Sequence, residues 1–241
     1  MITNYRWLVT VIISASLVLS CGCGAKANHA LVKSDMSLLA PIKMVRYETP
    51  GIMKATGAET TLFALMTVAV PGGSALLVAG DAIGKSRGSG TQGVIPDFGS
   101  AVMDNFLANV KKEVPDWPEL IAVREPIKED STEHATVIEL DVKRLAYGSI
   151  DLSRGGIVLE RGLDKGVIAE GFLSKTNVKM KDLRGEVIWE KSYVYLSKDY
   201  GRERTLEELE ADNCKLLKDE MMFAAEKTAQ DFIDHLNGKT Y

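Results

Sequence analysis

The chain has few cysteines and no excess of basic charge. Three cysteines in 241 residues exclude a small domain held together by many disulfides. Lysine and arginine number 29 against 33 aspartates and glutamates, so the basic excess that nucleic-acid backbones require is missing. Hydrophobic residues make up 46% and charged residues 26%, values typical of a globular domain rather than a disordered chain or a multi-span membrane protein. We therefore expect a globular protein with no nucleic-acid partner.

Residues 1–20 have the pattern of a signal peptide. Arg6 and the free amino group give a positive start, and residues 7–19 follow without a charge. These 13 residues are too few to span a membrane, which needs about 20 apolar residues in a helix. The pattern is typical of the apolar core of a secretory leader.

The leader ends in Val-Leu-Ser-Cys at residues 18–21. This resembles the lipobox of bacterial lipoproteins: an aliphatic residue, a variable one, a small one, and a cysteine. The resemblance implies cleavage before Cys21 and a lipid such as palmitate on its sulfur. Because Gly22 follows in place of an aspartate, it also implies transfer to the outer membrane, facing the periplasm. A plain secretory signal cleaved near Cys23 or Ala25 is the alternative.

We expect the mature chain to consist of a lipid-anchored tether, residues 21–41, and a single periplasmic domain, residues 42–238. Within the domain, apolar periodicity predicts one helix capped by Asp97 and a second that begins with a Thr205–Glu208 capping box and ends at Gly238. Alternating or apolar runs predict strands over residues 42–49, 120–124, 135–147, 167–180 and 186–197. The late strands are sequence neighbours, which favours an α+β fold with a mostly antiparallel sheet and helices on one face.

An uncharged segment interrupts the domain. Residues 60–80 carry no charge over 21 positions, but Pro-Gly-Gly at 71–73 breaks the run. We expect an apolar hairpin rich in glycine and alanine, inserted over residues 57–84. It either packs on its own domain or contacts the membrane, and in the second case an oligomeric export or pore component becomes the alternative function.

Three further pieces carry a family resemblance. They are Tyr-Glu-Thr-Pro at 47–50 before the apolar segment, Leu-Arg-Gly-Glu-Val-Ile-Trp at 183–189, and the acidic start of the last helix at 206–220. Together they resemble uncharacterised bacterial envelope lipoproteins. The middle piece is similar to the strand-turn-strand of lipoproteins of the penicillin-binding-protein activator, curli-export and exopolysaccharide-export groups. The resemblance implies an α+β periplasmic domain and brings no catalytic residue with it.

Residues 79–86, Ala-Gly-Asp-Ala-Ile-Gly-Lys-Ser, fit a relaxed phosphate-loop pattern. The glycine-rich residues that follow do not favour the helix that would hold the phosphates, so we expect no nucleotide and no other cofactor. The three histidines, His29, His134 and His235, share no local spacing typical of a metal site, and we expect none.

Signals for catalysis are equally thin. No Gly-x-Ser-x-Gly elbow is present, and we interpret Glu139 and Asp141 as a solvated strand face rather than a carboxylate pair. Trp189, Tyr193 and Tyr195 recur at period two, which favours a packed face over a ligand platform. For the late cysteine, residue 214, a free thiol on the last helix is the simpler expectation, and pairing with residue 23 remains open.

The sequence therefore predicts a non-enzymatic lipoprotein of the cell envelope. It would be attached to the membrane through lipid on Cys21 and would bind or scaffold an envelope protein partner or a second copy of itself. Two alternatives remain: the oligomeric export or pore component, and an envelope hydrolase whose site assembles from residues far apart in the chain.

Overall fold

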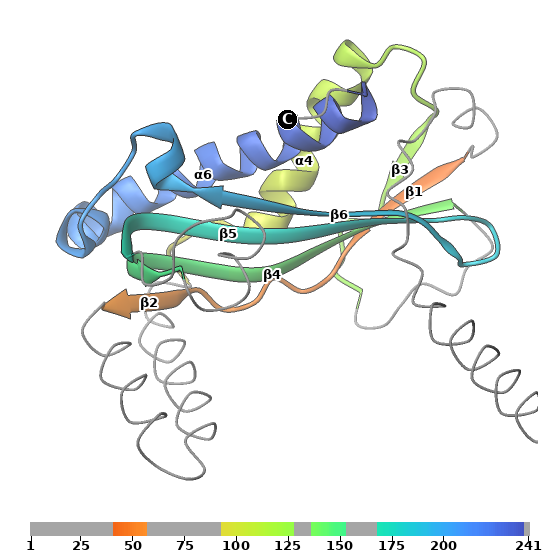
Figure 1. Ribbon diagram of the computed structural model, residues 1–241. Helices are drawn as coiled ribbons and strands as arrows, with labels where there is room; N and C mark the ends of the chain where they lie inside the picture. The colour runs from red at the N-terminus through yellow and green to blue at the C-terminus, as the bar shows by residue number, and fades with distance from the viewer. Residues whose placement is uncertain (1–40, 57–92, 128–135, 153–167, 239–241) are drawn as a thin grey trace, which may run out of the picture.

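The computed structural model describes residues 41–56, 93–127, 136–152 and 168–238, which form the predicted α+β domain (Figure 1). Its elements are β1 (Ile42–Arg46), β2 (Met53–Thr56), α4 (Phe98–Glu113), β3 (Leu120–Ala122), β4 (Thr136–Asp151), β5 (Ile168–Lys181), β6 (Val187–Leu196), the short 3-10 helix η2 (Ser197–Tyr200) and α6 (Leu206–Leu236). The signal peptide, the tether up to residue 40, the apolar hairpin and the phosphate-loop-like residues lie outside the described ranges, and so do Cys21 and Cys23. No helix within those ranges is long and apolar enough to cross a membrane.

The strands form one mixed sheet in the order β3-β1-β4-β5-β6. β4, β5 and β6 are antiparallel neighbours and make the longest pairings, as the sequence predicts. The N-terminal strands differ from a purely antiparallel arrangement, because β1 and then β2 pair in parallel with successive parts of β4. β2 itself is four residues long and follows a Pro-Gly pair, and sequence periodicity does not reveal it.

A bulge in β4 decides which side chains reach the core. The register shifts between Val142 and Arg144. Before the shift Ile138 and Leu140 belong to the main core, and after it Leu145 and Tyr147 do, so the inward positions change from even to odd numbers. The bulge therefore lets β4 keep an apolar face toward the helices from Ile138 to Tyr147.

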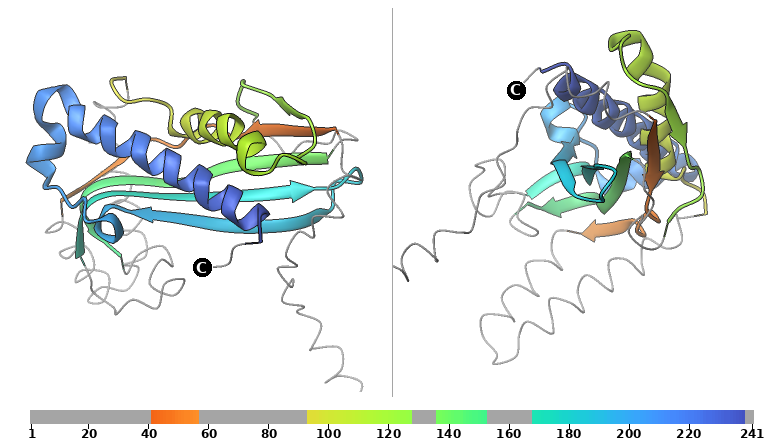
Figure 2. Two further views of the ribbon diagram at one scale, coloured as in Figure 1. Left: turned by 90° about the horizontal axis from the view of Figure 1, so that it is seen from above. Right: turned by 90° about the vertical axis from the view of Figure 1, so that its right-hand side faces the viewer.

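Both helices cover the same face of the sheet and pack on each other (Figures 1 and 2). The predicted apolar stripes of α4 and α6 are buried there. Phe232 of α6 stacks between Phe106 of α4 and Trp189 of β6, with ring centroids 4.5 Å and 5.5 Å apart. The prediction that Trp189, Tyr193 and Tyr195 form a packed face is confirmed, since all three belong to this core.

The opposite face of the sheet carries a second, smaller apolar cluster and a buried ion pair. The cluster consists of Ala55, Ala146, Ile150, Leu152, Ala169, Leu173 and Leu196. The prediction of a solvated Glu139–Asp141 face is wrong for Glu139, which is 1% exposed and accepts from Lys181 Nζ at 2.7 Å. Asp141 is half-buried and pairs with Lys143. Glu139 tolerates burial because its lysine partner is buried beside it.

The last helix begins as predicted but is not continuous. Thr205 and Glu208 form the reciprocal capping box, and the left-handed Gly238 follows the helix end. Between these ends, residues 212–214 adopt left-handed backbone angles, with φ between 49° and 59°. Aspartate and asparagine, the first two residues of this stretch, enter the left-handed region more readily than most residues. The kink separates a first turn, which Lys54 holds through Glu210 at 2.7 Å, from the long helix beyond it.

Candidate functional site

A cleft of about 330 Å³ opens on the helix side of the sheet, where α4 begins. It lies between the β1–β2 connection, the segment that leads into α4, and α6. Of the described residues that line it, four are polar and seven are apolar: Arg46, Glu48, Thr49 and Asp97, then Pro50, Ile52, Ile95, Pro96, Pro126, Leu145 and Met221. Ligand pockets commonly measure about 300 to 1,000 Å³, so this cleft takes one or two side chains or a small ligand.

Arg46 is the buried charge of the cleft. It ends β1, and strand alternation places it on the helix side with Ile42 and Met44. Only 7% of the residue is exposed. Its Nη1 lies 3.0 Å from Asp97 Oδ2, whereas its buried Nε donates to no acceptor among the described residues. An unpaired buried donor costs about 1–3 kcal/mol, and this Nε has almost no surface that a solvent molecule can reach.

Asp97 fixes the position of the Arg46 guanidinium. As the N-cap of α4 it accepts from the Ser100 amide at 3.2 Å, and it also accepts from the Thr49 hydroxyl at 2.6 Å. Burial opposes ionisation of Asp97, but these hydrogen bonds and the charge of Arg46 outweigh burial and lower its pKa below the ordinary value. A carboxylate with a lowered pKa is a weak general base, which argues against a Thr49 nucleophile activated by Asp97.

Glu48 gives the cleft its excess charge. Its side chain is exposed, and it makes no hydrogen bond or ion pair with any residue in the described ranges. Arg46 contributes one positive charge, and Glu48 and Asp97 contribute one negative charge each, so the lining carries a formal charge of −1. The cleft is therefore lined by a buried guanidinium and an exposed carboxylate between apolar walls.

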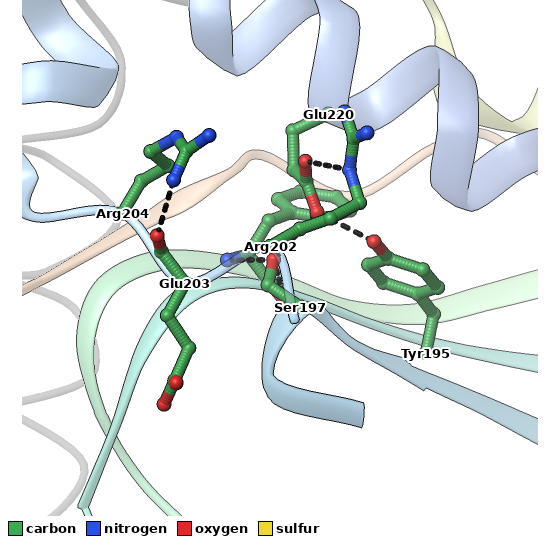
Figure 3. Close-up of polar contacts among 7 residues, drawn as sticks. Tyr195, Ser197, Arg202, Glu203, Arg204 and Glu220 are labelled. Carbon is green, nitrogen blue, oxygen red and sulfur yellow. Dashed lines mark hydrogen bonds and ion pairs between the residues drawn. The ribbon is translucent and has the colours of Figure 1, made fainter. Parts of the chain in front are cut away.

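A second polar cluster lies between α6 and the end of β6 and centres on Glu220 (Figure 3). Glu220 is 3% exposed. Its carboxylate accepts from the hydroxyls of Tyr195 at 2.5 Å and Ser197 at 2.7 Å, and from Arg202 Nε at 2.7 Å. Ser197 Oγ also accepts from the Phe172 amide at 2.8 Å. The cluster thus ties β5, β6 and the segment after η2 to α6.

Aromatic rings enclose this cluster on its outer side. Tyr200 stacks on Tyr195 with centroids 5.0 Å apart, and Phe223 meets both rings edge-on. The Arg202 guanidinium carbon lies 4.3 Å from the centre of the Phe223 ring. Burial, followed by the contact with Glu220, raises the pKa of Tyr195, so its hydroxyl keeps the proton that it donates. These contacts leave the Glu220 carboxylate fully engaged within the protein.

Within the described ranges, the residues that the sequence singled out for chemistry do not come together at one site. Of the three histidines only His235 lies in the described ranges, where Nδ1 contacts the Asp231 carbonyl and Nε2 contacts Lys191 Nζ. Cys214 is a buried free thiol, in line with the simpler expectation for it. Across the described residues, no group of three or more histidine, cysteine, aspartate or glutamate side chains could hold a metal ion.

Sequence reasoning missed both Arg46 and Glu220, although each leaves a signal. Arg46 continues the inward alternation of Ile42 and Met44, and a charge at an inward strand position needs a partner. Glu220 falls among the inward residues Leu217 and Met221 of a helix, where a charge is again unexpected.

No match to the chain is found among protein-family models, curated proteins or solved structures.

Proposed function

We propose that this protein is a lipid-anchored outer-membrane lipoprotein whose α+β domain binds an envelope partner without catalysing a reaction. The lipobox pattern at residues 18–21 supports the anchor, and the resemblance to envelope lipoproteins supports the location. The observation that carries the binding role is the cleft beside Arg46, whose apolar walls are combined with a guanidinium and with a Glu48 carboxylate that has no partner in the described ranges.

The tether predicted over residues 21–41 would give the domain room to work beside the membrane. A flexible chain of about 20 residues has a root-mean-square end-to-end distance of roughly 25 Å, and fully extended it reaches about 70 Å. The domain that begins with β1 would therefore remain close to the membrane surface and still meet partners of different heights. Several acyl chains on one cysteine would make this attachment durable, since each buried methylene contributes about 0.8 kcal/mol.

The chemistry of the cleft favours binding over catalysis. Nucleophilic catalysis needs a hydroxyl or thiol beside a base of suitable pKa. Among the described residues of the lining the only hydroxyl group belongs to Thr49, and its hydrogen bond goes to Asp97, whose pKa is lowered. The remaining polar groups, on Arg46 and Glu48, suit recognition of a ligand's acceptor and of its positive charge.

The anchor is tested by metabolic labelling with an alkyne fatty acid in a bacterial host. Cys21→Ala should abolish the label. The protein should then be found as unprocessed precursor or in the soluble fraction instead of as a lipid-anchored membrane protein. Cys23→Ala is the matched control, because it removes a neighbouring cysteine outside the lipobox, and it should keep both label and membrane retention. Label that persists in Cys21→Ala and disappears in Cys23→Ala would overturn the proposed anchor.

A further inference from the structure

We propose that Lys191 of β6 is a site of covalent modification by small aldehydes and that His235 of α6 moves the proton in this reaction. The inference goes beyond the proposed binding role and does not depend on it. A lysine amine condenses with carbonyl compounds to form an imine, provided that it is neutral and reachable. Lys191 is half-buried on β6, the edge strand of the sheet, which the last turns of α6 cover (Figure 2).

The hydrogen-bond partner of Lys191 is an imidazole. Its Nζ contacts His235 Nε2, and His235 Nδ1 lies 2.7 Å from the Asp231 carbonyl oxygen. A carbonyl oxygen only accepts, so Nδ1 carries a proton and Nε2 of the neutral ring presents a lone pair to the lysine. Tyr193, on the same face of β6, packs against the imidazole in a T-shaped contact with ring centroids 5.6 Å apart. The imidazole is therefore held with its unprotonated nitrogen against Lys191.

Lysines of β2, β4 and β5 are held by carboxylates instead. The pairs are Lys54–Glu210, Lys143–Asp141, Lys179–Glu190 and Lys181–Glu139. Within the described part of the chain, Lys191 makes no ion pair with a carboxylate, and its cross-strand neighbour is the buried Val178. The ammonium of Lys191 thus has a neutral ring and an apolar side chain where those lysines have a negative charge.

This environment favours the neutral amine. Burial lowers the pKa of Lys191 below its ordinary value, and the charge of Asp231 opposes that change only in part. A lowered pKa leaves a larger fraction of Lys191 as the neutral amine near neutral pH, and that form attacks a carbonyl carbon. A carboxylate beside a lysine acts in the opposite direction, because it stabilises the ammonium.

The reaction balances within this pair of side chains. Lys191 Nζ passes one proton to His235 Nε2, and its lone pair bonds to the aldehyde carbon while the carbonyl π electrons move to oxygen. A second proton of Nζ moves to that oxygen and gives a carbinolamine. The imidazolium then donates its proton to the hydroxyl group, water leaves, and the nitrogen lone pair forms the C=N bond of an iminium ion. This product keeps the positive charge that Asp231 attracts, whereas an acyl donor would leave a neutral amide, so the site favours an aldehyde.

The test is reductive labelling of the full-length protein in detergent micelles with propanal and cyanoborohydride near neutral pH. The hydride reduces the imine to a stable secondary amine, and mass spectrometry of peptides gives the initial rate at each lysine. We expect Lys191 to react about tenfold faster than Lys215, because it is neutral more often and has a base beside it. Lys215 is exposed and makes no hydrogen bond or ion pair in the described ranges, so it is the internal reference.

His235→Gln tests the role of the imidazole. Glutamine keeps an oxygen that accepts from Lys191 but cannot carry the proton, so the rate at Lys191 should fall to about that of Lys215. Glu226→Ala, at an exposed position of α6, is the matched control and should keep the wild-type ratio of the two rates. The inference is overturned if Lys191 reacts no faster than Lys215 in the wild-type protein, if His235→Gln keeps the wild-type ratio, or if an acylating reagent selects Lys191 and propanal does not. None of these outcomes alters the fatty-acid label on Cys21, so the two proposals fail separately.

Discussion

The two polar clusters of the domain differ in how completely their hydrogen-bonding groups are paired. In the Glu220 cluster, two hydroxyls and a guanidinium converge on one carboxylate, and aromatic rings enclose the group. In the cleft, Arg46 is nearly as buried as Glu220, at 7% against 3% exposure, but its Nε has no acceptor in the described part of the chain. Space for a ligand lies beside Arg46, whereas rings and helix occupy the surroundings of Glu220.

This difference separates a structural role from a binding role. A buried polar network that is fully paired holds its elements in one arrangement, and removing a member leaves the others unpaired. A buried group that is only partly paired costs free energy, and a cleft beside it leaves space for a ligand. Substitutions in the Glu220 cluster should therefore act mainly on stability, and substitutions at the cleft should act mainly on binding.

The largest effect is expected for Glu220→Ala. It leaves the hydroxyls of Tyr195 and Ser197 buried without their acceptor, and it removes the partner of Arg202. The side chain of Arg202 is 38% exposed and can turn to water, so we expect a loss of about 3 kcal/mol in the free energy of unfolding, at the low end for a broken buried ion pair. Urea denaturation measures the loss. Glu226→Ala, at an exposed position of the same helix, is the control and should change stability by less than about 0.5 kcal/mol. Equal effects in the two variants would show that the Glu220 network does not stabilise the fold.

A smaller loss of stability is expected for a substitution at Gly171 of β5, which lies against Ser197 of the Glu220 cluster. Gly171 has φ 125°, and a Cβ there would lie 2.6 Å from the Ser197 Cβ. Gly171→Ala should therefore cost roughly 2–3 kcal/mol, from backbone strain together with displacement of the serine that bonds Glu220. Gly201→Ala is the matched comparison, because Gly201 also has a positive φ, of 63°, but open space around it, and we expect about 1 kcal/mol. Thermal unfolding followed by circular dichroism measures both. A Gly171→Ala variant no less stable than Gly201→Ala would contradict the close packing around Ser197.

Local features of the fold could be predicted from the sequence, and non-local ones could not. The capping box of Thr205 and the stripes of both helices depend on residues a few positions apart, so periodicity reveals them. The parallel pairing of β1 and β2 with β4 brings together residues far apart in the sequence, and no local pattern specifies it. The left-handed kink after the first turn of α6 is an intermediate case, because Asp212 and Asn213 tolerate it without requiring it.

The candidate site was harder to predict because its residues belong to separate segments. Arg46 ends β1, Asp97 caps α4, and Met221 lies on α6, so only the packing of the two helices on the sheet brings them to one cleft. The sequence did predict that Asp97 caps a helix. It gave no indication that the same carboxylate would hold a buried arginine, since that contact depends on how β1 enters the sheet.

The smallest expected effect concerns the Arg46–Asp97 pair of the cleft. It is a change in how the stability of the protein depends on pH. The pKa of Asp97 is lowered in the folded protein from an ordinary value of 3.8, so its ionised form adds stability above about pH 4, and this contribution is lost as the pH falls through the folded pKa. Asp97→Asn keeps an N-cap but removes the charge that pairs with Arg46. We expect the variant to be less stable than wild type by about 1 kcal/mol or less at pH 7 and to lose less stability between pH 5 and pH 3, as measured by thermal unfolding across that range. Asp104→Asn removes an exposed carboxylate from α4, the helix that Asp97 caps. This variant should lose as much stability between pH 5 and pH 3 as wild type does. If the stability of Asp97→Asn instead falls in parallel with that of wild type down to pH 3, the Arg46–Asp97 contact does not contribute a charged pair to stability in solution.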